Sequence, residues 1–242
     1  DSGATVSRSL VYFGLDGLPT GVGIASAKLK LYQTYATTCT ATQLDVYGVG
    51  ANWNSATVWS NAPTSDGYGP RTTTSFAAGI SGSCPSAWVD VDVTDLVRQW
   101  YAGTTPDLGV YLVAHDESAG SNYKRFASGD AGASTAPALE ITYSNPPAQS
   151  VPTTSTLADD YVIALTNPTL ATSVATDPDG DTVSYWYQMS SGTTADSGSI
   201  VAQSGLIGSP SWMVPAGSLQ DGGVYTWTVW TFDGTVFKKA DW

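Results

Sequence analysis

The sequence predicts an all-β chain of two sandwich domains, and three observations lead to that class. Runs in which apolar and polar residues alternate recur along most of the 242 residues, and Gly, Pro, Asn or Ser bounds each run. A convincing helical pattern occurs over a single short segment. A proline-rich stretch near residue 150 divides the chain, whose length suits one large or two modest domains.

Seven strand-like runs fill the first 145 residues. They span residues 7–15, 26–35, 42–49, 88–96, 108–115, 123–128 and 137–143. In the second run, Ala27, Leu29 and Leu31 fall on one face and alternate with lysine and tyrosine, as the two-residue period of a half-buried strand requires. We therefore expect these three side chains in the core.

The helical segment overlaps the end of the fourth run. Thr94 suits the N-cap position, and Asp95 suits the positive start of a helix. The apolar stripe consists of Leu96, Val97 and Trp100. Gly103 is expected to end the helix. Seven strands and one short helix indicate an antiparallel sandwich of jelly-roll type over residues 1–145.

Residues 146–155 read as a short, stiff linker, because two consecutive prolines favour an extended backbone. Residues 156–242 again contain strand-like runs. These span residues 172–177, 182–190, 210–215 and 223–234. Turn signals such as PDGD, QDGG and FDGT separate the runs, which predicts a second sandwich of the immunoglobulin or fibronectin type III kind.

Composition and charge narrow the classes of partner. Nine lysines and arginines oppose 21 aspartates and glutamates, so the net charge is −12 and no general phosphate-neutralising surface is expected. Nucleic acid and anionic membranes are therefore poor partners. No window approaches the ~18 uninterrupted apolar residues of a membrane span, so no membrane insertion is expected. Charged residues make up 12% of the chain, and the abundant Ser, Thr and Gly suit an extracellular, secreted or cell-surface protein.

The chain has few residues for enzymatic chemistry. Two cysteines and one histidine, His115, are too few for a common zinc site, and no nucleophile motif surrounds His115. Asp90 and Asp92 share one strand face about 6.6 Å apart, which lies within the range of an inverting glycosidase pair. Any two aspartates with this spacing on a solvated strand give the same distance, so we interpret both as surface residues and expect no enzyme.

Cys39 and Cys84 lie in matching Ser/Thr/Gly-rich surroundings, ATTCTATQ and SGSCPSAW. We interpret them as one disulfide, since little Lys and abundant Trp, Tyr, Thr and Gly suit exported β proteins. Two buried free thiols are the alternative interpretation.

The loop between residues 49 and 71 offers side chains that suit a sugar ligand. Sugars present an apolar face rimmed by hydroxyls, so their sites combine exposed Trp or Tyr rings with Asp, Asn, Gln or Arg. The candidate carbohydrate-binding residues are Trp53, Trp59, Asp66, Tyr68 and Arg71. In the alternative, both tryptophans plug the edge of the sandwich, and Tyr68 and Arg71 are the better contact candidates.

Asp177, Asp179 and Asp181 in TDPDGDTV are closely spaced carboxylates of the kind that calcium collects. Their spacing resembles the start of an EF-hand loop, but Gln188 stands at the twelfth position, where that loop needs a bidentate Glu. Two interpretations remain open: a hairpin turn shaped by its proline and glycine, and a cadherin-like or interdomain calcium site shared with Asp159 and Asp160 near the linker. No other cofactor is expected.

Several motifs of the first domain occur in the order and spacing of a known family. They are SRSLVYFGLDGLPTG, SAKLKLYQ, the run from Trp53 to Pro63, VDVTDLVRQWYAG, LGVYLVAHDE, YKRFAS and PALEITY. Through them the domain resembles the DNRLRE domain of bacterial surface proteins, a module related in fold to certain carbohydrate-binding modules. The paired TTCTA and SGSCPSAW are similar to the actinobacterial branch of that family, and this resemblance implies that Cys39 and Cys84 are bridged.

The second half resembles the sandwich that follows this domain in Rhs/YD-repeat and other multi-module exported proteins, through TDPDGDTVSYWYQ and WMVPAGSLQDGGVYTWTVWTFDG. Members of the first family usually begin with another strand, and such sandwiches usually close with a strand after the DG turn. Both ends are therefore expected to be incomplete. A fragment of a longer protein explains this, and strand donation between subunits that build a fibre is the alternative.

These inferences predict a non-catalytic, extracellular pair of modules from a larger surface or secreted bacterial protein. Its partners are expected to be polysaccharide, bound by the N-terminal domain, or other modules of the same protein. The competing prediction is a purely structural stalk, shell or fibre subunit that binds no ligand.

Overall fold

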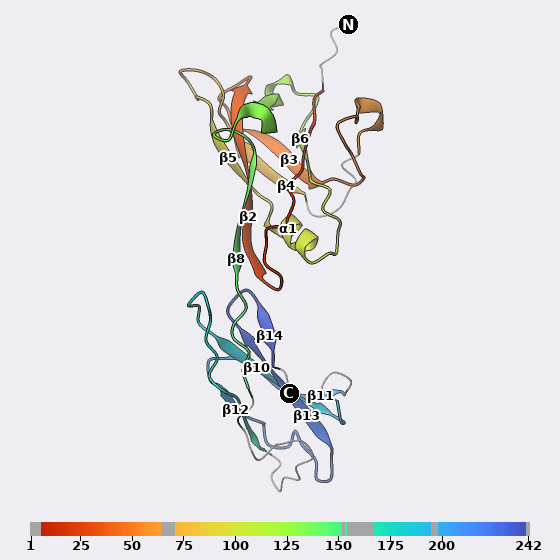
Figure 1. The fold of residues 1–242 in the computed structure, drawn as a ribbon, viewed down its shortest axis with the longest axis vertical. Helices are drawn as coiled ribbons and strands as arrows, with labels where there is room; N and C mark the ends of the chain where they lie inside the picture. The colour runs from red at the N-terminus through yellow and green to blue at the C-terminus, as the bar shows by residue number, and fades with distance from the viewer. Residues whose placement is uncertain (1–5, 64–70, 152, 154–166, 195–197, 241–242) are drawn as a thin grey trace. The chain divides into compact units, whose positions relative to one another are not determined.

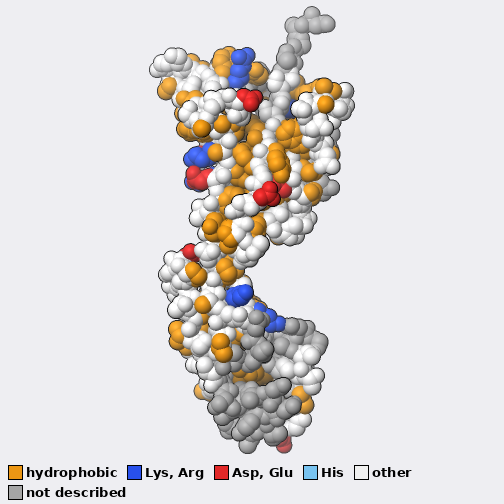
Figure 2. All heavy atoms as spheres, in the orientation of Figure 1, with side chains coloured by type: hydrophobic (Ala, Val, Ile, Leu, Met, Phe, Trp, Pro, Cys, Tyr) orange, Lys and Arg blue, Asp and Glu red, His pale blue; other side chains and the backbone are white. Residues whose placement is uncertain are grey.

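The computed structural model describes residues 6–63, 71–151, 153, 167–194 and 198–240 (Figure 1). Within these ranges the paired strands run antiparallel and the single α-helix is short, which confirms the predicted all-β class. The chain divides into two compact units, one of residues 1–18 and 24–142 and the other of residues 19–23 and 143–242. Charged side chains are sparse on the visible face of each unit, in line with the composition (Figure 2).

The first unit contains two four-stranded sheets. One has the strand order β1 (Ser9–Val11), β6 (Val110–Ala114), β3 (Thr42–Gly48) and β4 (Thr72–Phe76). The other has the order β5 (Ala87–Asp92), β2 (Gly23–Ala36) and β7 (Lys124–Phe126), and β8 (Ala138–Ser144) also pairs with β2. Two sheets, each with an apolar face, form the expected sandwich.

Alternation along the strands produces the core of this unit. Ala27, Leu29 and Leu31 of β2 have no exposed surface, which confirms the predicted core face of this strand. Leu44 and Val46 of β3 are also buried. Because successive side chains of a strand point to opposite faces, Asp45, which lies between these two residues, points away from the core.

The predicted helix is present as α1 (Thr94–Tyr101). Its buried residues are Leu96, Val97 and Trp100, as predicted. The predicted N-cap is wrong: Thr94 is the first helical residue, and its backbone N–H and hydroxyl both donate to the Asp92 carboxylate, at 2.9 and 2.6 Å. These two bonds lower the pKa of Asp92. Gly103 has φ near 68° and ends the helix as predicted, because a residue with a Cβ is strained there.

The second unit consists of a four-stranded sheet and a two-stranded sheet. The larger has the order β11 (Ile200–Ile207), β10 (Ser184–Ser191), β13 (Tyr225–Phe232) and β14 (Phe237–Lys239). The smaller pairs β12 (Ser211–Met213) with β9 (Thr169–Ala171).

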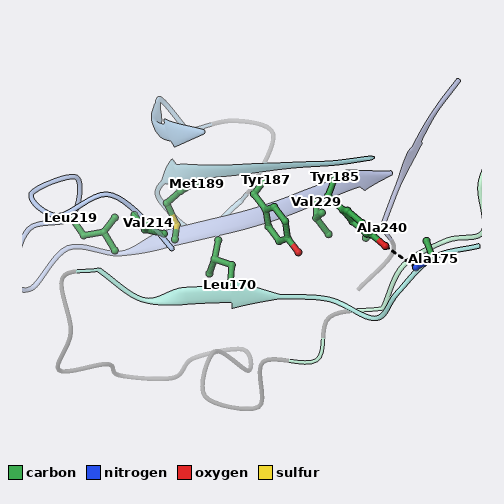
Figure 3. Close-up of a cluster of buried hydrophobic side chains, with 9 residues drawn as sticks. All are labelled: Leu170, Ala175, Tyr185, Tyr187, Met189, Val214, Leu219, Val229 and Ala240. Carbon is green, nitrogen blue, oxygen red and sulfur yellow. Dashed lines mark hydrogen bonds between the residues drawn. The ribbon is translucent and has the colours of Figure 1, made fainter. Parts of the chain in front are cut away.

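Side chains from both sheets of the second unit meet in one apolar cluster (Figure 3). Tyr187 of β10 and Leu170 of β9 have no exposed surface. The Tyr187 ring stacks on two indole rings, with centroids 6.2 Å from Trp212 and 6.0 Å from Trp227. The Tyr185 hydroxyl accepts a hydrogen bond from the backbone N–H of Ala175 at 2.9 Å, drawn as a dashed line in Figure 3.

The sequence does not predict β4, β11 or β14. The β4 run, TTTSF, is almost uniformly polar, so it shows no alternation. In β11 a glycine with φ near 66° and two register shifts against β10 interrupt the period. β14 lies after the DG turn, where the sequence led us to expect that the closing strand is missing. Its three residues pair with β13.

The strand predicted at residues 172–177 is wrong, because the strand lies earlier, at β9. Beyond it the backbone changes partners: the N–H of Thr172 donates to Pro210, and the N–H of Ser173 donates to Val151. The N–H of Ala148 likewise donates to Thr176 at 2.8 Å. Part of the proline-rich stretch predicted as a linker is therefore hydrogen-bonded within the second unit, and residues 152, 154 and 155 of that stretch lie outside the described residues.

Candidate functional site

One face of the sheet β1-β6-β3-β4 points away from the core, and we call it the outer face. On it Tyr47 pairs with Tyr111, and Asp45 pairs with Val113 on one side and Thr73 on the other. Directly paired residues point to the same side of a sheet, so these five side chains share the outer face. Strand pairing thus brings together polar and aromatic groups from three distant segments.

A hollow of about 210 Å³ lies at the Tyr111 end of the outer face. It is lined by Arg8, Leu10, Trp53, Asn54, Thr57, Val58, Trp59, Ala62 and Tyr111. The lining combines two indole rings, a phenol and a guanidinium. Two of the predicted sugar-binding residues, Trp53 and Trp59, are therefore brought to one hollow.

The two tryptophans of the hollow differ in exposure. Trp53 is partly buried, and its indole N–H donates to the Leu108 carbonyl at 2.7 Å, which fixes the ring. Trp59 is 61% exposed and begins a 3₁₀ turn. This turn is closed by Asn61, whose side-chain oxygen accepts from the N–H of Val58 at 2.6 Å. Trp53 therefore anchors the loop, while Trp59 presents its ring to solvent.

Arg8 is the polar centre of the hollow. Its Nε and Nη2 both donate to the Glu117 carboxylate at 2.7 Å, and its Nη1 donates to the Tyr111 hydroxyl at 2.9 Å. The guanidinium carbon lies 4.8 Å from the centroid of the Trp59 ring, within cation–π range. The bidentate pair lowers the pKa of Glu117 and raises that of Arg8. Arg8 thus contacts three side chains at once, those of Glu117, Tyr111 and Trp59.

A second polar cluster lies beside the hollow on the outer face. Asp45 is 3% exposed, and its carboxylate accepts from the Thr73 hydroxyl at 2.6 Å. His115 Nδ1 lies 3.0 and 3.2 Å from the two Asp45 oxygens. Arg71 Nη1 lies 3.7 Å from the same carboxylate, and a hydrogen bond to Tyr47 raises the pKa of Arg71. We call these four residues, Asp45, Thr73, His115 and Arg71, the Asp45 cluster.

The comparison with protein families accounts for this unit as a whole. The model of carbohydrate-binding module family 96 matches residues 1–143, which is more than half of the chain. The chain belongs to carbohydrate-binding module family 96. No curated protein matches it. The match covers nearly all of both sheets of the first unit and includes the hollow and the Asp45 cluster, which lie on the outer face of one of them.

Of the predicted sugar-binding residues, the structure brings three to the outer face of the module. Trp53 and Trp59 line the hollow, and Arg71 joins the Asp45 cluster. Asp66 and Tyr68 lie outside the described residues. Sequence reasoning missed Arg8, Glu117 and Tyr111, because Arg8 meets the other two only through the pairing of β1 with β6, more than 100 residues away.

Asp90 and Asp92 of the module are engaged separately. Asp90 lies 3.5 Å from the Lys30 ammonium and 4.0 Å from that of Lys28. Asp92 accepts the two hydrogen bonds from Thr94 at the start of α1. One carboxylate thus forms surface ion pairs, and the other accepts hydrogen bonds from the first residue of α1.

Asp177, Asp179 and Asp181 of the second unit place one carboxylate oxygen each within 4.8 Å of one another. The Asp177 carboxylate accepts from the N–H groups of Asp179 and Asp181, at 2.8 and 3.3 Å. The Asp179 carboxylate accepts from the backbone and side-chain nitrogens of Asn145, at 2.6 and 2.9 Å, and these bonds lower its pKa. The turn is therefore held by hydrogen bonds of its own, and its oxygens have the chemistry that calcium prefers.

The two cysteines form the predicted disulfide. Cys39 and Cys84 are bonded, with Cα atoms 5.8 Å apart. The bond joins the segment between β2 and β3 to the loop before β5. Among the described residues no helix is long and apolar enough to cross a membrane.

Proposed function

We propose that the module binds polysaccharide through the hollow of its outer face, with the Trp59 ring as the platform on which a sugar stacks. The observation that carries this proposal is the 61% exposure of Trp59 in a lined hollow. Large aromatic rings are normally buried, and exposed aromatic surface is typical of binding sites. The fixed ring of Trp53 and the hydrogen bonds of Asn61 hold the loop that presents Trp59.

Polar groups around the ring suit the hydroxyls of a sugar. Arg8 donates and Glu117 accepts, and their mutual hydrogen bonds fix both groups before a ligand arrives. Because the two charges neutralise each other, the hollow favours a ligand that offers hydroxyls on its rim and an apolar ring face. Such prior ordering reduces the entropy that binding loses.

We further propose that the chain is a non-catalytic, extracellular part of a larger surface or secreted protein. The disulfide supports an oxidising compartment, and the low share of charged residues fits it. The resemblance of the second half to immunoglobulin-like sandwiches of exported proteins supports a spacer role for the second unit.

Binding of the intact chain to a panel of polysaccharides tests the proposal. The panel contains cellulose, xylan, mannan, chitin and uronic-acid polymers, screened by affinity electrophoresis and measured by calorimetry. Trp59→Ala is expected to weaken binding about 30-fold, or about 2 kcal/mol, as for other central aromatic contacts.

Trp88→Ala is the matched control. Trp88 is the other exposed tryptophan of the described residues, and it lies on β5 in the opposite sheet, edge-on to Tyr32. Its removal is expected to leave the affinity unchanged. Failure of every polymer to bind, or equal losses in the two variants, would overturn the proposal.

A further inference from the structure

The Asp45 carboxylate is buried on the side of β3 that faces away from the core. Burying a charge is costly, and replacing a buried ion pair by apolar residues is often neutral or stabilising. Stability of the fold therefore does not by itself account for an aspartate at this position. Its partners differ from it in exposure: the side chains of His115 and Arg71 are 38% and 50% exposed, against 5% for that of Asp45.

Asp45 sets the hydrogen-bonding character of these two exposed groups. A carboxylate accepts hydrogen bonds, so the His115 nitrogen beside it, Nδ1, carries the proton in the neutral ring. The other nitrogen, Nε2, is then an acceptor. Arg71 donates from every nitrogen of its guanidinium. An acceptor, His115 Nε2, and a donor, the Arg71 guanidinium, thus lie beside one carboxylate, and a pair of sugar hydroxyls, each able to donate and accept, complements them.

The Asp45 cluster lies next to the hollow along the same two strands. Tyr111 lines the hollow and pairs with Tyr47, and Asp45 lies two residues from Tyr47 on β3. At ~3.3 Å per residue, the row of Tyr47 and Tyr111 lies about 6.6 Å from the row of Asp45 and Val113. A sugar chain that lies across β6 and β3 can therefore contact both places.

We propose that His115 and Arg71, positioned by Asp45, form a second subsite that binds the hydroxyls of another sugar unit of the chain whose first unit stacks on Trp59. This inference rests on the proposed function and extends it, because it assigns the ligand to a chain of at least two sugar units lying across β6 and β3. His115 and Arg71 touch the ligand, and Asp45 acts through them as a positioning residue.

The single histidine of the chain allows a direct test by nitrogen NMR of the intact, ¹⁵N-labelled protein. In the free protein at a pH where the ring is neutral, the spectrum is expected to show the Nδ1–H tautomer. Asp45→Asn is expected to reduce or abolish this preference, since an amide can donate as well as accept. An Nε2–H tautomer in the unmodified chain would overturn the inference.

The second part of the test is a ligand titration, which uses cello-, xylo-, manno- and chito-hexasaccharides and a hexauronate as probes. The hexasaccharide that binds is expected to shift the His115 ring nitrogens. His115→Ala and Arg71→Gln are each expected to weaken its affinity about tenfold, as for the loss of one or two hydrogen bonds. Arg125→Gln is the control, because Arg125 lies on β7 of the opposite sheet between Tyr35 and Tyr123.

The outcomes separate the two proposals. Binding that depends on Trp59 but leaves the His115 signals and both variants unchanged would overturn the second subsite and leave the hollow as the site. Absence of binding by any probe would overturn both. Thermal unfolding of each variant shows whether a lost affinity comes from a lost fold.

Discussion

Removing the disulfide gives the sharpest stability prediction for the first unit. Cys39 and Cys84 are 45 residues apart in the sequence. In the chain-entropy model, cross-linking a loop of this length removes about 13 cal/mol/K from the unfolded chain, which is about 4 kcal/mol at 25 °C. Cys39 is exposed and Cys84 is only partly buried, so few native contacts are lost with the sulfur atoms. We expect the double variant Cys39→Ser/Cys84→Ser to lose most of that free energy.

Calorimetry of the double variant and of the reduced and oxidised wild type measures this loss. At the usual relation between free energy and melting temperature for domains of this size, the midpoint of the first unit falls by roughly 10–15 °C. The second unit contains no cysteine, so its transition serves as the internal control. A first-unit midpoint that changes by less than about 2 °C, on the same relation, would refute the reasoning that the bond acts by restricting the unfolded chain.

Three further predictions concern the ion pair, the acidic turn and the core. Because folding lowers the pKa of Glu117, its pair with Arg8 stabilises the module above the ordinary carboxyl pKa of 4.5, and this stabilisation is lost as the pH falls through the lower folded value. Glu117→Gln is therefore expected to reduce the free energy of unfolding by about 0.5–1 kcal/mol near neutral pH and to leave it unchanged in acid. A difference in melting temperature between wild type and variant that is the same at every pH would contradict this. Excess calcium in place of EDTA is expected to leave the melting midpoint of the second unit unchanged, because hydrogen bonds already hold the turn at Asp177; a rise would establish a calcium site there. Leu170→Ala is expected to destabilise the second unit by about 2–5 kcal/mol in urea denaturation, and a loss below that range would show that the core of Figure 3 closes around the gap.

The sequence predicts best what depends on local alternation. The buried face of β2 follows from a period of two, and the buried stripe of α1 follows from helical spacing. The disulfide could be inferred from matching surroundings and a family resemblance. By contrast β4, whose three threonines and one serine differ little in hydropathy from a loop, shows no pattern in the sequence and is defined only by its pairing with β3.

The sequence predicts only part of the candidate site, because strand pairing leaves no local pattern of residues. Trp53 and Trp59 lie in one loop and can be found together, but nothing in that loop shows which ring is anchored and which is exposed. That difference depends on the Leu108 carbonyl, which is 55 residues away. Arg8, Asp45 and His115 become neighbours of the hollow only through strand pairing, which residue patterns do not specify.

The most direct test of the central claim is the spectrum of the indole N–H groups during a ligand titration. The Trp59 signal is assigned by its loss in Trp59→Phe, and the hexasaccharides described above are added to the intact labelled chain. If the hollow is the binding site, the Trp59 signal moves with increasing ligand while the Trp88 signal on the opposite sheet stays in place. A ligand that moves Trp88 and leaves Trp59 unchanged would contradict the claim.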